Sequence, residues 1–376
     1  MRPGTLCSAA LVAIASLTLM SAEAAAGRNA AAPKVEVVFV LDTTGSMGGL
    51  LQGAKQKIWS IVNEIAKGQP SPDIRLGLIG YRDKGDAYIT TRTDLTTDLD
   101  AVYEKLMAFQ AAGGGDGPEH VNQAMHEAVH RMSWSAGRRV LKVVFLVGDA
   151  PPHMDYQDDV KYPETLQQAM RRDLIVNTIL CGNNTAARRT WQDIARKAEG
   201  RFVAIAQSGG TVAVTTPYDA EMAALSRRLE ATHLSYGSVA EREAVRAKMK
   251  RSRAVMAEAA PEAAASRAAY KARAGAVGRG RDLVADVASG EADLDAMGDA
   301  ELPAELQGKS AAERKKLLEK KQTERRRLSK QIAELSSKRD AFVKEKLAEK
   351  GAVRDSFDAQ VIESIRSKAA KKGIRY

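Results

Sequence analysis

Cysteine is almost absent from this chain, whose 376 residues contain only Cys7 and Cys181. Cys7 lies in an N-terminal segment that we expect to be removed, so Cys181 would remain alone. An intrachain disulfide is then impossible. The stability of the mature chain must come from packed secondary structure or from a bound metal.

The familiar motifs of nucleotide and hydrolase sites are also missing. The sequence has no phosphate loop, no dinucleotide fingerprint and no nucleophile elbow. It also lacks an apolar run long enough to span a membrane, because the stretch from Leu6 to Met20 is shorter than the roughly 20 residues required. These absences favour a binding module over an enzyme of a common class.

The N-terminus has the pattern of a secretory signal peptide. Arg2 precedes the apolar stretch, and the small-residue sequence Ala22-Glu23-Ala24 follows it. Cys7 stands before the apolar stretch rather than after it, which disfavours a lipoprotein anchor. We expect residues 1–25 to be cleaved and the mature chain to be periplasmic or secreted.

Charge is distributed unevenly along the chain. Residues 1–240 contain 25 basic and 25 acidic side chains, whereas residues 241–376 contain 32 and 22. The whole net charge of +10 therefore lies in the last third. This asymmetry predicts two units with different tasks, at 34–237 and 238–376.

The first unit alternates short apolar, β-branched runs with amphipathic helical patterns. Val35–Leu41 is the clearest buried strand. Further strands are expected at 74–81, 88–91, 140–147, 174–180 and 201–206, with helices between them. This alternation predicts an α/β fold with a doubly wound, mostly parallel sheet and helices on both faces.

The second unit, 238–376, is rich in Ala, Lys, Arg and Glu and is expected to be helical. Leu318, Leu328 and Ile332 follow the near-heptad spacing of a coiled coil. Lys321, Arg325 and Arg339 fall on the same seam, which argues against a long stable coiled coil. Basic residues crowd the same predicted helix at Lys315, Lys316, Lys320, Lys321, Arg325, Arg326 and Arg327. We expect this helix either to face solvent or to bind an anionic envelope surface. Nucleic acid is disfavoured because the tail offers few aromatic rings for stacking.

Oxygen-bearing side chains gather where predicted strands and helices begin or end. Asp42, Thr44 and Ser46 follow the first strand, and Asp149 follows the strand 140–147. Asp116 and Glu119 lie in the glycine-rich segment 113–119. The carboxyl ends of parallel strands meet at one edge of a sheet. Oxygen donors converging there predict a site for Mg²⁺, with Mn²⁺ or Ca²⁺ as alternatives.

These motifs, in this order, resemble the metal-ion-dependent adhesion site of von Willebrand factor A domains. The family's first motif, Asp-x-Ser/Thr-x-Ser, stands here as Asp42, Thr44 and Ser46, and its last aspartate as Asp149. The threonine of the middle motif is missing, and the loop resembles a Gly-Gly-Gly-Asp-x-Pro-Glu variant with Asp116 in the site.

The resemblance implies a function as well as a fold. In that family the hydroxyls bind the ion directly, while the aspartates act through water or from outside the ligand shell. The cation keeps an open position that a partner's Asp or Glu fills. The chain is therefore expected to be a non-enzymatic, metal-dependent protein-binding or adhesion module.

Two alternatives remain open at this point. His126, Glu127 and His130 match the His-Glu-x-x-His motif of zinc proteases, in which two imidazoles share a helix face. No downstream Gly-x-x-His supplies a third ligand, and a pair of solvated histidines explains the match as well. The second alternative is an envelope structural protein that binds mainly through its basic tail.

Overall fold

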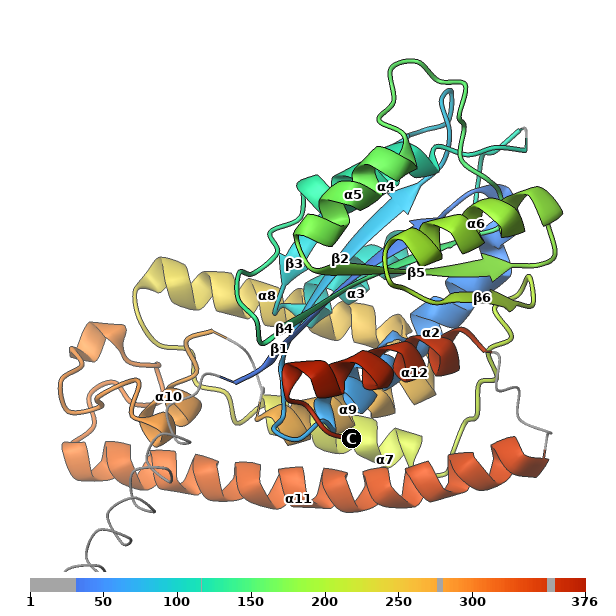
Figure 1. Ribbon diagram of the computed structural model, residues 1–376. Coiled ribbons are helices and arrows are strands. Elements are labelled where there is room, and N and C mark those ends of the chain that lie inside the picture. Colours follow the sequence, from blue (N-terminus) through green and yellow to red (C-terminus); the bar gives the residue numbers. More distant parts are fainter. Residues whose placement is uncertain (1–31, 116, 276–279, 350–355) are drawn as a thin grey trace, which may run out of the picture.

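The computed structural model describes residues 32–115, 117–275, 280–349 and 356–376. The expected signal peptide (1–25) and the candidate ligand Asp116 lie outside the described residues. Within them, a mostly parallel sheet carries helices on both faces, and further helices follow it (Figure 1). The α/β fold predicted from the sequence, with a helical C-terminal region, is confirmed.

The sheet contains six strands in the order β3-β2-β1-β4-β5-β6. Only the pairing of β3 with β2 is antiparallel. The strands are β1 (Lys34–Asp42), β2 (Asp73–Tyr81), β3 (Thr90–Thr96), β4 (Val140–Gly148), β5 (Leu174–Cys181) and β6 (Phe202–Ile205). β1 lies between β2 and β4, so the strand that carries the first motif is central and buried.

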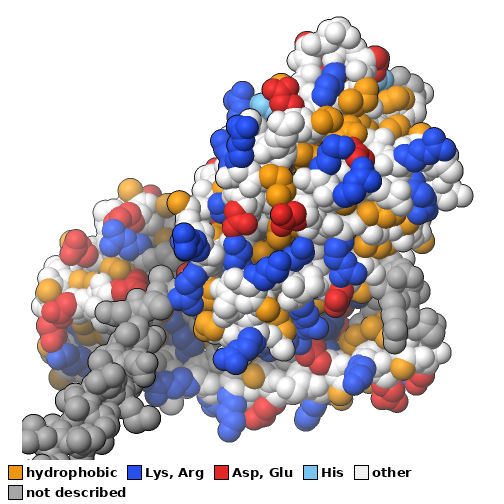
Figure 2. All heavy atoms as spheres, in the orientation of Figure 1, with side chains coloured by type: hydrophobic (Ala, Val, Ile, Leu, Met, Phe, Trp, Pro, Cys, Tyr) orange, Lys and Arg blue, Asp and Glu red, His pale blue; other side chains and the backbone are white. Residues whose placement is uncertain are grey.

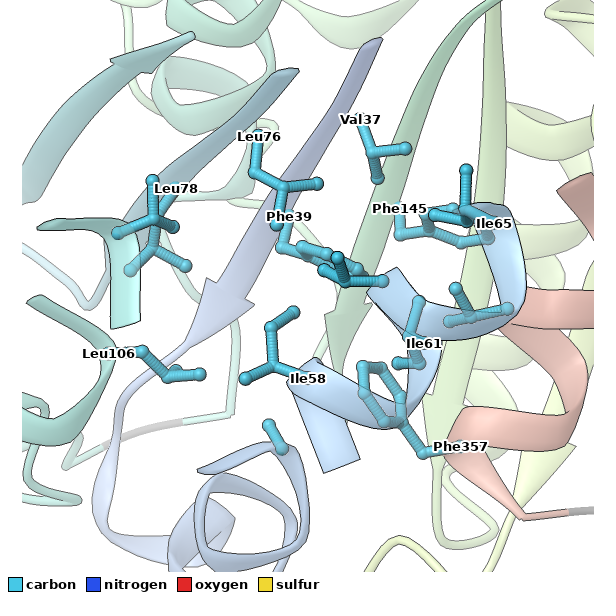
Figure 3. Close-up of a cluster of buried hydrophobic side chains, with 14 of the residues drawn as sticks. Val37, Phe39, Ile58, Ile61, Ile65, Leu76, Leu78, Leu106, Phe145 and Phe357 are labelled. Atoms are coloured by element: carbon cyan, nitrogen blue, oxygen red, sulfur yellow. The ribbon is translucent and has the colours of Figure 1, made fainter. Parts of the chain in front are cut away.

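Helices cover both faces of the sheet, and the side chains of β1 point alternately toward one face and the other. Val37 and Phe39 point to one face, where they pack with α2 (Gly48–Ala66) and α3 (Leu99–Ala108) (Figure 3). Val38 and Val40 point to the other face. That face is covered by α4 (Val121–His130), α5 (Tyr162–Arg171) and α6 (Thr185–Lys197). Both faces are buried, as a parallel sheet requires.

The third strand differs from its prediction. The sequence suggested 88–91, whereas β3 spans Thr90–Thr96. This strand lies at the edge of the sheet and is rich in threonine, with Arg92 and Asp94 among its polar side chains. An edge strand with one solvated face needs few apolar residues, so its sequence lacks the run that marked the central strands.

The C-terminal helices pack onto the sheet domain. They are α7 (Asp219–Glu230), α8 (Val239–Glu258), α9 (Pro261–Ala274), α10 (Leu283–Ser289), α11 (Ala311–Glu349) and α12 (Phe357–Ala369). α12 brings Phe357 to within 6.0 Å of Phe39, measured between ring centroids, and Figure 3 shows it beside Ile61 of α2. The last helix is thus part of the core beneath the sheet.

The long helix α11 lies under α7 and α9, as Figure 1 shows, and its charged seam is paired. Arg325 forms a 2.8 Å ion pair with Asp282, and Arg339 forms one of 2.7 Å with Asp219. Leu328 is fully buried between these arginines. The cations that interrupt the heptad pattern therefore meet acids on neighbouring segments and do not prevent packing.

A buried ion cluster also joins the tail to the sheet domain. Arg267 of α9 contacts Asp100 of α3 at 2.6 Å and Glu230 of α7 at 2.8 Å. Lys271 contacts the same two carboxylates at 3.1 and 3.2 Å. Burial would raise the pKa of Asp100, but the charges of Arg267 and Lys271 hold it well below its usual range.

The described helices include none that combines the length and the hydropathy of a membrane span.

Candidate metal centre

Asp42 is the last residue of β1 and is fully buried. Its Oδ1 accepts hydrogen bonds from the backbone N–H of Thr44 (2.8 Å) and from Thr44 Oγ1 (2.6 Å). Its Oδ2 is buried without a hydrogen-bond donor among the described residues. Oδ1 therefore fixes the conformation of the loop at Thr44, and Oδ2 remains available to bind a cation.

The two hydroxyls of the first motif lie together at the start of α2. Thr44 is buried, whereas Ser46 is exposed, and their hydroxyl oxygens are 3.4 Å apart. Ser46 lies in a short 3-10 turn (Gly45–Met47) that leads from β1 into α2. This turn points both hydroxyls toward the edge of the sheet where β1 ends.

Asp149 follows β4, the neighbour of β1, and is half-buried at the same edge. Its Oδ2 accepts a 2.7 Å hydrogen bond from the Gln207 amide, which also reaches the carbonyl of Ser46 at 3.3 Å. A Cβ on Gly148 would lie 3.0 Å from Asp42 Oδ2. Glycine at the end of β4 thus leaves space for the Asp42 carboxylate beside Asp149.

The glycine-rich loop closes the third side of the site. Gly45 donates a backbone hydrogen bond to the Gly113 carbonyl (3.0 Å). Gly114 has a positive φ of 73°, and a Cβ there would lie 3.1 Å from Thr44 Cβ and 3.2 Å from Glu119 Oε1. Glycine is required for this conformation and this close approach. Thr44 and the Glu119 carboxylate therefore both lie next to Gly114 in this loop.

The carboxylates at this edge repel one another. Burial, and then the charge of Asp149, raise the pKa of Asp42 to about 7, although its hydrogen bonds from Thr44 oppose the shift. Burial raises the pKa of Glu119 to about 8, with further contributions from Asp42, Asp83, Asp86 and Asp149. Glu119 Oε2 is also buried without a hydrogen-bond donor in the described part of the chain. A cation would relieve this repulsion and use the orphaned oxygens.

The donor set fits a hard divalent cation rather than zinc. Its members are carboxylates and hydroxyls, which Mg²⁺, Mn²⁺ and Ca²⁺ prefer. Within the described ranges, which omit Asp116, no three His, Cys, Asp or Glu side chains are grouped to hold a metal ion by themselves. The hydroxyls of Thr44 and Ser46 are therefore needed to complete a ligand set here.

Two polar residues of this edge, Asp86 and Gln207, were not predicted from the sequence, and Glu119 was named there without a place among the ligands. Asp86 accepts hydrogen bonds from the Gly114 N–H at 3.1 and 3.2 Å, and Gln207 contacts Asp149. Asp86 lies in the turn after β2, where an Asp near a Gly is an ordinary turn residue. Gln207 follows β6, so the strand-end rule used for Asp42 and Asp149 could have found it.

The His-Glu-x-x-His match lies on α4, on the far side of the glycine loop. His126 and His130 have ring centroids 4.5 Å apart, so the two imidazoles do share a helix face. Glu127 accepts hydrogen bonds from Thr90 Oγ1 (2.9 Å) and Gln123 Nε2 (2.8 Å). No third His, Cys, Asp or Glu joins the pair within the described residues. The arrangement there lacks the third ligand of a zinc protease.

Comparison with known proteins identifies the sheet domain. Residues 36–217 match the von Willebrand factor A domain family. The chain thus contains a von Willebrand factor A domain, as the sequence motifs and the strand order indicate. Human von Willebrand factor A domain-containing protein 7 is 30% identical over 183 residues, which are 49% of this chain and 19% of that protein.

A second curated relative and one solved structure are similar to less than half of this chain. A putative ariadne-like RING finger protein of Acanthamoeba polyphaga mimivirus is 27% identical over 41% of this chain and 15% of its own length. The solved von Willebrand factor A domain of SpRpn10 is 12% identical, with a TM-score of 0.35, over 46% of this chain and 89% of that one. This chain spans less than a fifth of the curated proteins named here.

Proposed function

We propose that the protein is a non-enzymatic binding module that captures an acidic group of a protein partner through a divalent cation. The von Willebrand factor A domain makes an interaction or adhesion role the general expectation. The observation that supports the metal-dependent form is the orphaned oxygen of Asp42, buried beside Asp149 and Glu119. A buried carboxylate oxygen without a donor or a cation is costly, and a cation bound at this edge would remove that cost.

Asp42, Thr44, Ser46 and Asp149 would hold the cation, and Asp116 would complete the set from the glycine loop. Mg²⁺ is the first candidate, with Mn²⁺ and Ca²⁺ as alternatives. Bound there, the ion supplies a positive charge to which a partner's Asp or Glu can bind. Thr44 and Asp42 form a buried floor, whereas Ser46 and Asp149 reach the surface. A site open on one side in this way suits recognition better than a closed structural role.

Export to the periplasm or the medium belongs to the same proposal. The signal-peptide pattern at residues 1–25 motivates it. Fractionation and N-terminal sequencing of the mature chain test it directly. An intact Met1 on cytoplasmic protein would contradict it.

The decisive experiment compares Ser46→Ala with Ser208→Ala by calorimetry with Mg²⁺ and Mn²⁺. Both serines are exposed and lie near the site, but Ser208 has no place in the donor set. We expect Ser46→Ala to weaken ion binding at least about ten-fold, since even outer-shell changes cost about that much, and Ser208→Ala to bind normally. Equal affinity of the two variants would refute the ligand assignment. Stoichiometric zinc in the purified protein would instead favour the protease alternative.

A capture experiment tests the partner. The full mature chain is used to retain proteins from envelope extract, with Mg²⁺ and with a chelator. We expect retention that the chelator and Ser46→Ala both abolish. Retention that neither treatment changes would contradict metal-dependent capture and favour binding through the basic helices.

A further inference from the structure

A cavity lies away from the sheet edge, between α8 and the segments that precede and follow it. It has a volume of about 410 Å³ and is lined by α8, by the end of α7 with its following loop, and by residues 303–305. We call it the α8 pocket. Figure 1 shows this region where α8 approaches the segments around α10.

The α8 pocket lies at the boundary between two packed units of the tail. On one side α7, α9 and α11 share a hydrophobic cluster that includes Leu229 and Leu328. On the other side Leu234 and Leu302 belong to a separate cluster with α10. Gly237 N–H donates to the Glu301 carbonyl (2.8 Å), so the two units are fixed relative to each other. Ligand sites occur preferentially at such boundaries.

Three cations of α8 line this pocket, at positions that share one helix face. They are Arg246, Lys250 and Arg253, spaced four and three residues apart. Arg246 and Lys250 are exposed and have no acidic partner among the described residues. Arg253 contacts Glu230 at 3.3 Å through its Nε. The helix therefore presents two unneutralised charges and a third cation to the cavity.

The acids that line the pocket are already neutralised by other groups. Glu230 is held by Arg267 (2.8 Å) and Lys271 (3.2 Å), and burial, which would raise its pKa, is outweighed by their charges. Glu305 pairs with Lys321 at 3.1 Å. Neither acid forms an ion pair with Arg246 or Lys250, so the electrostatic potential in the cavity is positive.

The remaining walls are partly apolar. Met249 lies between the cations on α8, and Leu234 and Pro303 face it from the neighbouring segments. A smaller cavity of about 140 Å³ shares Glu230 and Arg253 with the α8 pocket. Ser226 lines that smaller cavity, and its hydroxyl is buried without a hydrogen-bond partner in the described chain. Ser226 is not part of the α8 pocket lining, so this hydroxyl belongs to the neighbouring cavity alone.

We propose that the α8 pocket binds a small organic phosphate. The phosphate group carries a charge of about −1.5 to −2 at pH 7, which matches the two unneutralised cations. The arginine guanidinium forms paired hydrogen bonds to phosphate oxygens, and Lys250 adds a point charge. The organic part lies against Met249, Leu234 and Pro303. This activity is separate from ion binding at the sheet edge and does not depend on it.

Calorimetry at low ionic strength with phenyl phosphate, on the full mature chain, tests this proposal. Benzyl alcohol provides the apolar body without charge, and inorganic phosphate provides the charge without the body. We expect phenyl phosphate to bind more tightly than inorganic phosphate, and benzyl alcohol not to bind. No binding of phenyl phosphate, or equal binding of inorganic phosphate, would overturn the proposal of an organic phosphate.

Matched variants on the same helix locate the site. Arg246→Gln and Lys250→Gln each remove one charge that lines the pocket, whereas Arg251→Gln removes one from an exposed position outside its lining. We expect each of the first two to weaken phenyl phosphate binding at least about ten-fold, and Arg251→Gln to change it less than about two-fold. Equal loss in all three would show a nonspecific charge effect and refute the site, as would no loss in the first two. Circular dichroism checks that the variants are folded.

Discussion

Replacing Asp42 by Asn should make the metal-free protein more stable while removing its response to Mg²⁺. The substitution keeps an oxygen that can accept the hydrogen bonds from Thr44, which are 2.8 and 2.6 Å long, and replaces the unpaired Oδ2 by an uncharged NH₂ group. The folded environment raises the pKa of Asp42 from 3.8 to about 7, mainly by burial. A shift of that size corresponds to about 4 kcal/mol of destabilisation of the ionised form. We expect Asp42→Asn to recover about 2–4 kcal/mol at pH 8 in the presence of a chelator.

The pH dependence has a definite sign. Because the folded pKa of Asp42 lies above the unfolded value, the folded state binds more protons between pH 4 and 7. Its contribution to stability is therefore fully present below about pH 4 and is lost as the pH rises through about 7. Asp42→Asn should lack this part of the loss. Burial and then the charge of Asp42 raise the pKa of Glu119 to about 8, so Glu119 adds a further loss up to about that pH, and this loss should be smaller in Asp42→Asn.

Urea denaturation between pH 5 and 8.5, with chelator or with saturating Mg²⁺, measures both effects. Mg²⁺ at about 100 times its dissociation constant should stabilise the wild-type protein by about 2.7 kcal/mol and leave Asp42→Asn unchanged. Asp158→Asn is the control, because Asp158 is an acid with 71% of its side chain exposed, so its ion pair with Lys84 should contribute little. If Asp42→Asn is less stable than wild type with chelator, and Mg²⁺ stabilises both equally, Asp42 merely caps the loop and the metal centre is refuted.

Three further predictions concern the C-terminal helices. Phe357→Ala should lower the free energy of unfolding by about 3–5 kcal/mol in urea, because the ring is buried beneath the sheet; a loss under 1 kcal/mol would show that α12 is dispensable. Arg267→Met should lower the free energy of unfolding by about 3–5 kcal/mol at neutral pH, because it leaves the buried carboxylates of Asp100 and Glu230 short of a partner. An unchanged midpoint of urea denaturation would contradict this. The triple substitution of Lys316, Lys320 and Arg326 by Gln should abolish salt-sensitive retention on anionic vesicles; equal retention, or none by wild type, would leave this face without a binding role.

The central part of the fold could be predicted from the sequence because its strands are buried on both faces. Val35–Leu41 and 140–147 are apolar runs interrupted by one charged residue each, Glu36 and Lys142, and each observed bound lies within one residue of its prediction. β3 was poorly predicted because its neighbours bury little of it, so threonine and charged residues are tolerated along its length. Edge position, which sets this pattern, depends on strand order and cannot be read from the strand alone.

The packing of the tail could not be predicted from its composition. Three cations on the α11 seam, at 321, 325 and 339, argued against a packed helix. Each forms an ion pair with an acid from outside α11. The three acids are Glu305, Asp282 and Asp219, respectively. Four of the seven crowded basic residues of α11 form such pairs or local ones, and Figure 2 shows Lys and Arg intermingled with Asp and Glu over this face. Net charge by region therefore overstated the free positive surface.

The candidate site was predictable where it followed strand ends and unpredictable where it followed loops. Asp42 and Asp149 end adjacent parallel strands, so their proximity follows from topology. The position of Glu119 at this edge depends on the left-handed Gly114 beside it and on backbone hydrogen bonds such as the one from Glu119 N–H to the Pro151 carbonyl (2.9 Å). Neither contact leaves a periodic signal in the sequence.

The loop between β6 and α7 connects the candidate metal centre with the C-terminal helix α12. Gln207, whose amide contacts Asp149, lies in the segment between β6 and α7. Two residues later the Gly209 carbonyl accepts a 3.0 Å hydrogen bond from the Phe357 N–H, at the start of α12. The other side of this loop packs against α2. A Cβ on Gly49 would lie 3.0 Å from Ser208, and a Cβ on Gly53 would lie 2.9 Å from Thr211. Deleting the tail would remove one wall of the loop and expose the core around Phe357. Loss of ion binding after such a deletion would not show that the tail binds anything, so point substitutions on exposed faces are the informative test of each unit.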